Sequence, residues 1–103
     1  MQIEIYYVPC PKDGTAQKLI TALLEMKLIA CGNVINSQSL YVWENEAVSD
    51  DEDVAVMKTL PEMHTAIEGA LKKLHPYKIP ALISWPAKCN SAYFDWIKSQ
   101  VSE

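Results

Sequence analysis

The stretch VINSQSLYVWENEAVSDDEDVAVMKT, residues 34–59, decides the fold of this 103-residue chain. It contains two β-rich arms, Val34–Glu44 and Asp53–Thr59, with the acidic run 50–53 between them. Such arms are typical of strands, so the stretch predicts an extended β-hairpin with a wide, solvated tip. The acidic run lacks the spacing and the glycine of an EF-hand calcium loop, and a solvated loop is therefore expected there.

An amphipathic helix is predicted before this hairpin. Apolar residues recur at helical spacing over residues 16–28, and polar residues occupy the other side. Asp13 or Thr15 can cap the start of this helix. Gly32 or Asn33 can take the left-handed backbone geometry that closes a helix.

A second helix is predicted after the hairpin. It opens at Pro61, since proline is accepted in a first helical turn. It stops at HPY, residues 75–77, because a proline disfavours helical geometry in the residue before it. Residues 79–85 then predict a strand, and residues 90–101 a short C-terminal helix capped by Asn90 or by the serine after it.

The predicted order, with a first strand over residues 2–8, is β-α-β-β-α-β followed by a helix. This order is that of an α+β, ferredoxin-like fold, and the length fits one domain over residues 1–103. One face of such a sheet needs a cover, and a short helix covers little of it. The strands carry a large apolar and aromatic surface, which predicts an oligomer whose sheets meet. These residues are Tyr6, Tyr41, Val42, Trp43 and Trp85.

Charge excludes several classes of partner. The net charge is −4, and the nine basic residues are all lysine. Arginine is the preferred bidentate ligand of phosphate and guanine, so its absence argues against nucleic-acid binding and phosphoryl transfer. The acidic balance also disfavours anionic membrane surfaces. No run of about 18 apolar residues is present, and the first residues lack the features of a signal peptide, so a cytoplasmic protein without membrane spans is expected.

Five motifs in register resemble those of one family. AQKLITALLEMKLIACGN (16–33) resembles a leucine-rich helix that runs into LAACVN. SLYVWENE (39–46) resembles SiYxWxGk, and VMKT (56–59) resembles iKT. LHPYKIP (74–80) resembles HPYEvPE, and SAYFDWI (91–97) resembles xxYLxWi. By these motifs the whole chain is similar to the CutA family, the divalent-cation tolerance proteins.

The resemblance implies a ferredoxin-like subunit in a compact, very stable homotrimer. Its subunit architecture is similar to that of the nitrogen-regulatory PII trimers, which are signalling proteins rather than enzymes. The implied role is divalent-metal tolerance or response, especially to copper, by binding metal ions and not by catalysis. No obligatory cofactor is implied, and copper or another divalent metal ion is the expected ligand.

The chain departs from the family pattern at several positions. Gly32 stands where the family often has valine, and Asn45 where the WxG turn has its glycine. Asparagine tolerates left-handed geometry, so that turn can survive. Lys78 and Ala81 replace acidic residues that are common in HPYEvPE. A ligand or metal role of those carboxylates would be lost here.

Three residues are candidate metal ligands. An imidazole such as that of His75 binds copper, nickel or zinc, and a thiolate such as that of Cys31 suits Cu(I). Cys10 matches a Cys-Pro that some relatives show, and these three could converge as a Cys₂His set. The structural alternatives are a hydrogen-bonded histidine that orders the turn and buried cysteines that only pack. Cys89 is interpreted as incidental, and His64 as an exposed surface histidine.

Three other interpretations remain open. The aromatic residues could line a small-molecule pocket between subunits, as in a PII-like sensor, or form interface core. They are Tyr41, Trp43, Trp85, Tyr93 and Trp96. The trimer could instead be a scaffold that anchors a partner protein. An enzyme that uses a Cys–His pair is disfavoured, because no orienting residue or oxyanion motif is visible.

Overall fold

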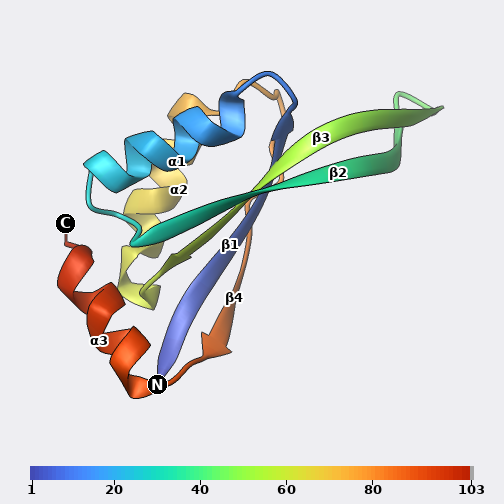
Figure 1. Cartoon of the computed structure of the whole chain (residues 1–103). Coiled ribbons are helices and arrows are strands. Elements are labelled where there is room, and N and C mark those ends of the chain that lie inside the picture. The colour runs from blue at the N-terminus through green and yellow to red at the C-terminus, as the bar shows by residue number, and fades with distance from the viewer. Residues whose placement is uncertain (103) are drawn as a thin grey trace.

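The computed structural model describes residues 1–102 of the chain. Its elements follow the predicted order (Figure 1). They are β1 (Gln2–Pro11), α1 (Thr15–Glu25), β2 (Cys31–Trp43), β3 (Glu46–Thr59), α2 (His64–Leu74), β4 (Ile83–Lys88) and α3 (Ser91–Gln100), with a 3₁₀ turn, Pro61–Met63, before α2.

The strands form one antiparallel sheet in the order β2-β3-β1-β4. Helices α1 and α2 pack on one face of it, where they bury Tyr6 and Met57 against Leu23 and Ile67. Helix α3 packs near the N-terminal end of β1 in a second, smaller core that contains Ile97. This arrangement confirms the α+β, ferredoxin-like fold.

The β2–β3 hairpin is longer and its tip narrower than the sequence pattern indicates. The strands pair without interruption up to Trp43 and Glu46. Glu44 and Asn45 alone form the turn, with φ values of 50° and 65°. Two consecutive left-handed residues match the twist of a two-residue hairpin turn, so Asn45 fills the role expected of it. The wide tip was a wrong prediction, because cross-strand pairing holds the acidic run 50–53 inside β3 despite its weak strand propensity.

Helix α1 ends earlier than predicted. Lys27, with φ 60°, takes the left-handed position, and Gly32 and Asn33 lie in β2 instead. The N–H of Leu28 donates to the carbonyl of Leu23 at 3.0 Å, which is the bond of a Schellman motif. Lysine therefore closes this helix in the place where glycine is more usual.

The start of α1 is also organised differently. Gly14, with φ 92°, is the N-cap residue, and no side chain caps the helix. Asp13 Oδ1 accepts hydrogen bonds from the Thr15 hydroxyl at 2.6 Å and from the Thr15 N–H at 3.1 Å. These bonds lower the pKa of Asp13. The two residues predicted as caps thus stabilise the turn before the helix.

The remaining boundaries agree better with the sequence. His75 ends α2 with extended backbone, φ −77° and ψ 132°, as the following proline requires. Asn90 is the N-cap residue of α3, although its side chain makes no cap bond. Strand β4 begins at Ile83, four residues later than predicted. No helix within residues 1–102 is long and apolar enough to cross a membrane.

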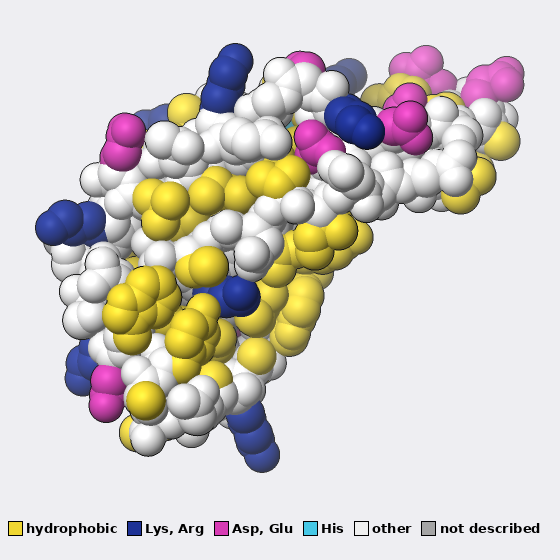
Figure 2. Space-filling model, in the orientation of Figure 1, with side chains coloured by type: hydrophobic (Ala, Val, Ile, Leu, Met, Phe, Trp, Pro, Cys, Tyr) yellow, Lys and Arg dark blue, Asp and Glu magenta, His cyan; other side chains and the backbone are white. Residues whose placement is uncertain are grey.

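The outer part of the β2–β3 hairpin projects from the body, and we call residues 36–51 the arm (Figure 1). The molecule is 45 Å along its longest axis and 24 Å along the next. Neither face of the arm is covered within the described residues, so Leu40 and Val42 are exposed on one face and Tyr41 and Trp43 on the other. Figure 2 shows acidic side chains on the arm and hydrophobic ones on the surface below it.

Candidate functional site

His75 is held by hydrogen bonds at both ring nitrogens. Nδ1 accepts the backbone N–H of Tyr77 at 3.1 Å, so Nε2 carries the proton and donates to the Pro9 carbonyl at 2.8 Å. The imidazole is buried, and its ring packs against the Tyr77 ring with centroids 4.8 Å apart. A metal ion could bind this imidazole only by displacing one of these bonds.

Cys10 is fully buried on the helix-covered face of the sheet. Its thiol donates to the Val8 carbonyl at 3.4 Å. Burial, with the neighbouring Glu52 carboxylate, raises the pKa of the Cys10 thiol to about 11. A thiol with this pKa remains protonated at neutral pH, which disfavours metal binding because the thiolate is the ligand.

Cys31 lies apart from the other two candidates. Cys10 pairs with Asp53 on β3, whereas Cys31 pairs with Lys58. Five residues along a strand span roughly 16 Å, so these cysteines do not meet within one subunit. Residues 1–102 contain no group of three or more His, Cys, Asp or Glu side chains that could hold a metal ion.

Two other polar residues also have structural partners. Lys58 donates from Nζ to the Asn33 Oδ1 at 2.9 Å. His64 is exposed, as predicted, but its Nδ1 lies 2.7 Å from the buried Tyr6 hydroxyl. Neither residue belongs to the cavity described next.

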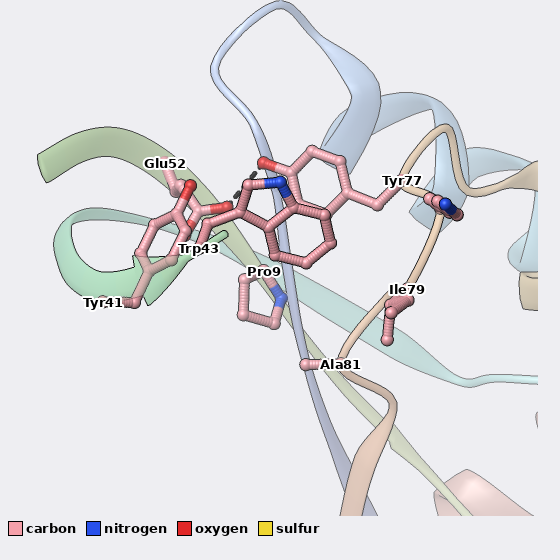
Figure 3. A pocket seen from close by; sticks show the side chains of 8 residues that line it. Pro9, Tyr41, Trp43, Glu52, Tyr77, Ile79 and Ala81 are labelled. Atoms are coloured by element: carbon pink, nitrogen blue, oxygen red, sulfur yellow. Dashed lines mark hydrogen bonds between the residues drawn. The ribbon is translucent and has the colours of Figure 1, made fainter. Parts of the chain in front are cut away.

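An aromatic cavity lies on the face of the sheet opposite α1 and α2 (Figure 3). Its volume is about 330 Å³, which falls within the range of small-molecule sites. Residues of β1, of the hairpin strands β2 and β3, and of the α2–β4 connection all contribute to it. The lining residues are Pro9, Tyr41, Trp43, Glu52, Tyr77, Lys78, Ile79 and Ala81.

A buried carboxylate lies in the cavity wall. Glu52 is 7% exposed, and its Oε2 accepts the Tyr77 hydroxyl at 2.6 Å, as the dashed line in Figure 3 shows. Burial and this hydrogen bond raise the pKa of Tyr77, so its hydroxyl stays protonated and continues to donate. The ion pairs in the described part of the chain join Glu68 to His64 and to Lys72, and none involves Glu52.

Tyr41 is positioned in a similar way. Its hydroxyl donates to the Asp50 Oδ2 at 2.6 Å, and this bond raises the pKa of Tyr41. Asp50 and Glu52 are two residues apart on β3, so their side chains lie on the same face of the sheet. Two tyrosine hydroxyls therefore point at two carboxylates along one strand.

The sequence interpretation identified only part of this site. Tyr41 and Trp43 were in the predicted aromatic set, whereas Trp85 and Trp96 do not line the cavity. Glu52 was interpreted as part of a solvated loop. The missed signal was the period-two spacing of residues 50 and 52, which places both on one face if the run is a strand.

The fold and the site together define a ferredoxin-like subunit with an aromatic cavity on the face of its sheet opposite α1 and α2. Residues 4–100 match the family model described as CutA1 divalent ion tolerance protein. The divalent-cation tolerance protein CutA of Thermus thermophilus is 32% identical over 97 residues, covering 92% of this chain and 94% of that protein. The crystal structure of CutA1 from Pyrococcus horikoshii has a TM-score of 0.93 at 30% identity, covering 97% of this chain and 99% of that one.

The chain belongs to the CutA1 family, as its motifs indicate. A relative from Oryza sativa, named as chloroplastic, is 30% identical over 101 residues and covers 96% of this chain and 57% of that protein. Family membership therefore does not fix the compartment, and the cytoplasmic location expected from the sequence stays a prediction.

Proposed function

We propose that this protein acts in divalent-cation tolerance, with copper as the metal, as a homotrimer that binds its effector and does not catalyse a reaction. The observation that supports this role is the match of residues 4–100 to a family described as divalent ion tolerance proteins. It extends over both halves of the fold and includes the hairpin, so the role is proposed for the whole domain, residues 1–103.

The arm supports the trimer. A two-stranded ribbon is at best marginally stable in water, yet this one is long and exposes Leu40 and Val42 on the face that does not line the cavity. Ile35, Ile83 and Trp85 extend the exposed apolar surface over the neighbouring strands. An apolar surface of this kind is typical of an interface between subunits. Neighbouring copies of the chain are the proposed cover.

Direct metal binding is the first candidate mechanism, with Cys10, Cys31 and His75 as its ligands. The geometry within one subunit favours Cys31 among them, because it is partly exposed while Cys10 is buried and His75 is hydrogen-bonded at both nitrogens. Residues 28–57 contain no basic residue and six acidic ones, so the hairpin also attracts cations electrostatically.

A competition titration of the reduced protein with Cu(I), Cu(II) and Zn(II) tests this mechanism. Cys10→Ser, Cys31→Ser and His75→Ala are measured beside the unchanged protein. Cys89→Ser and His64→Ala are the matched controls, since each removes the same donor type elsewhere. Stoichiometric binding that is lost in two of the first three variants would support a shared Cys/His site. Weak binding that no variant changes would rule out that site.

A second candidate function is a small-ligand sensor, and the aromatic cavity favours it. The cavity combines apolar walls with a few fixed polar groups, the usual make-up of a small-molecule site. Metal tolerance would then be an indirect output of the trimer. A metabolite screen by calorimetry on the assembled protein tests this function. Failure to find any ligand of any charge class would count against it.

A further inference from the structure

We propose that the aromatic cavity binds a small organic cation with an alkylated ammonium group. This inference rests on the small-ligand function proposed above and specifies the chemical class of the ligand. It is carried by three features of the cavity: its aromatic walls, its buried and unpaired carboxylate, and its pre-formed geometry.

The first feature is the set of aromatic walls. Tyr41, Trp43 and Tyr77 all line the cavity, and they come from two separate parts of the chain (Figure 3). Aromatic faces attract cations, and tryptophan does so most strongly. An alkylated ammonium group suits such walls because it is cationic and yet carries an apolar surface. Pro9, Ile79 and Ala81 add apolar lining to these walls.

The second feature is the charge of Glu52. A buried carboxylate is costly unless it is paired, and the structure supplies Glu52 with one neutral donor, the Tyr77 hydroxyl. No lysine in the described residues forms an ion pair with it. A cationic ligand would therefore supply the missing counter-charge. An anionic ligand would meet repulsion at the same place.

The third feature is the pre-formed geometry. His75 fixes the backbone and the ring of Tyr77, and Glu52 holds the Tyr77 hydroxyl. Asp50 holds the Tyr41 hydroxyl in turn. Side chains that are already oriented lose little entropy when a ligand binds.

Lys78 is the basic residue of the lining, but it is exposed, so its ammonium group can stay in water while its aliphatic stem borders the cavity.

The test compares choline with its neutral carbon isostere by isothermal titration calorimetry on the assembled protein. The isostere is the dimethylbutanol in which a quaternary carbon replaces the quaternary nitrogen of choline. The two probes share shape and differ in charge. We expect choline to bind at least about tenfold more tightly, since cation–π attraction and the Glu52 charge act on it alone. Equal affinities would overturn the proposal, because shape and apolar contact would then explain binding.

Two variants locate the interaction. Glu52→Gln keeps an acceptor for Tyr77 and removes the charge, and Trp43→Leu removes the largest aromatic wall. Each should lower choline affinity by about tenfold, with the oligomeric mass unchanged by light scattering. Glu46→Gln and Trp96→Leu are the controls, because both residues lie outside the lining. Loss of affinity in the controls alone would place the site elsewhere and overturn the proposal.

The outcomes separate this proposal from the sensor function. A screen that finds only anionic or neutral ligands would overturn the cation class and keep the sensor. No ligand of any class, together with protection of Trp43 from an aqueous fluorescence quencher, would indicate that a second copy of the chain fills the cavity. That result would overturn both.

Discussion

His75 Nε2 lies 2.8 Å from the carbonyl oxygen of Pro9, and this hydrogen bond joins the end of α2 to the end of β1. The two residues are far apart in the sequence, so the bond closes a long loop of chain. The other ring nitrogen accepts the N–H of Tyr77 and holds the turn that brings Tyr77 to the cavity. The HPY segment is therefore a positioning device for the aromatic site.

Removing the imidazole should lower stability. His75→Ala leaves the Pro9 carbonyl and the Tyr77 N–H without their partner in a largely buried place, which costs about 1–3 kcal/mol. Urea denaturation followed by circular dichroism measures the free energy of unfolding. Lys73→Ala, an exposed change in the same helix, is the control and should shift it little. An unchanged free energy of unfolding in His75→Ala would show that the two hydrogen bonds of the imidazole do not stabilise the fold.

The Cys10 thiol should be slow to react and should influence stability at high pH. Its pKa is raised to about 11, so the folded protein retains a proton that the unfolded chain loses at lower pH. The stability from this proton is complete below the ordinary thiol pKa and is lost as pH rises through the folded value. We expect the free energy of unfolding to fall between about pH 9 and pH 11, and to fall less in Cys10→Ala.

Alkylation followed by mass spectrometry gives an independent measurement. Cys31 and Cys89 are partly exposed, so both should react with iodoacetamide before the buried Cys10. The order should hold at pH 8 and be abolished in denaturant. Rapid labelling of Cys10 in the folded protein would contradict the buried, protonated thiol.

Gly32 should not accept a side chain. A Cβ there would lie 2.5 Å from Ile20 Cγ2 and 2.8 Å from Ile20 Cγ1. Gly32→Ala should therefore destabilise the protein by about 1–3 kcal/mol. In the background of Ile20→Ala, which removes these atoms, the same change should cost much less. Additive free energies of unfolding in this double-mutant cycle would argue against the contact.

The exposed sheet surface should hold the oligomer together. Ile35 is 50% exposed in β2, and Leu24 is 41% exposed on α1 away from the sheet. A charge buried at an interface is costly, so Ile35→Asp should reduce the mass measured by light scattering from three subunits to one, 11.6 kDa. Leu24→Asp should leave the mass unchanged. A single-subunit mass for the unaltered protein would contradict the trimer itself.

Much of the fold was readable from local patterns. Apolar spacing located α1 and α2, and the proline after His75 set the end of α2. These features depend on neighbouring residues, which a sequence displays directly. The hairpin tip did not follow from local patterns, because four acids disfavour a strand and only pairing with β2 keeps them in one. Helix closure at Lys27 had no glycine to signal it.

The site was harder to predict for the same reason. Glu52 and Tyr77 are 25 residues apart, and their hydrogen bond depends on the twist of the hairpin and the path of the α2–β4 connection. Sequence patterns gave the residue types, such as aromatic residues near Trp43, but not which of them share a wall. The Cys10, Cys31 and His75 set was chosen by donor chemistry, and strand register separates Cys31 from Cys10 within a subunit.

The two-residue turn at Glu44 and Asn45 restricts the lengths that the two strands of the arm can have. The turn has no spare residue that could absorb an insertion. One extra residue in either strand must therefore form a β-bulge or move every side chain beyond it to the opposite face of the sheet. The arm can then lengthen smoothly only by two residues in each strand, a step of roughly 7 Å. The distance that the arm can reach toward a neighbouring molecule therefore changes in fixed steps. Only insertions of two residues in each strand keep Tyr41 and Trp43 on the same face of the sheet.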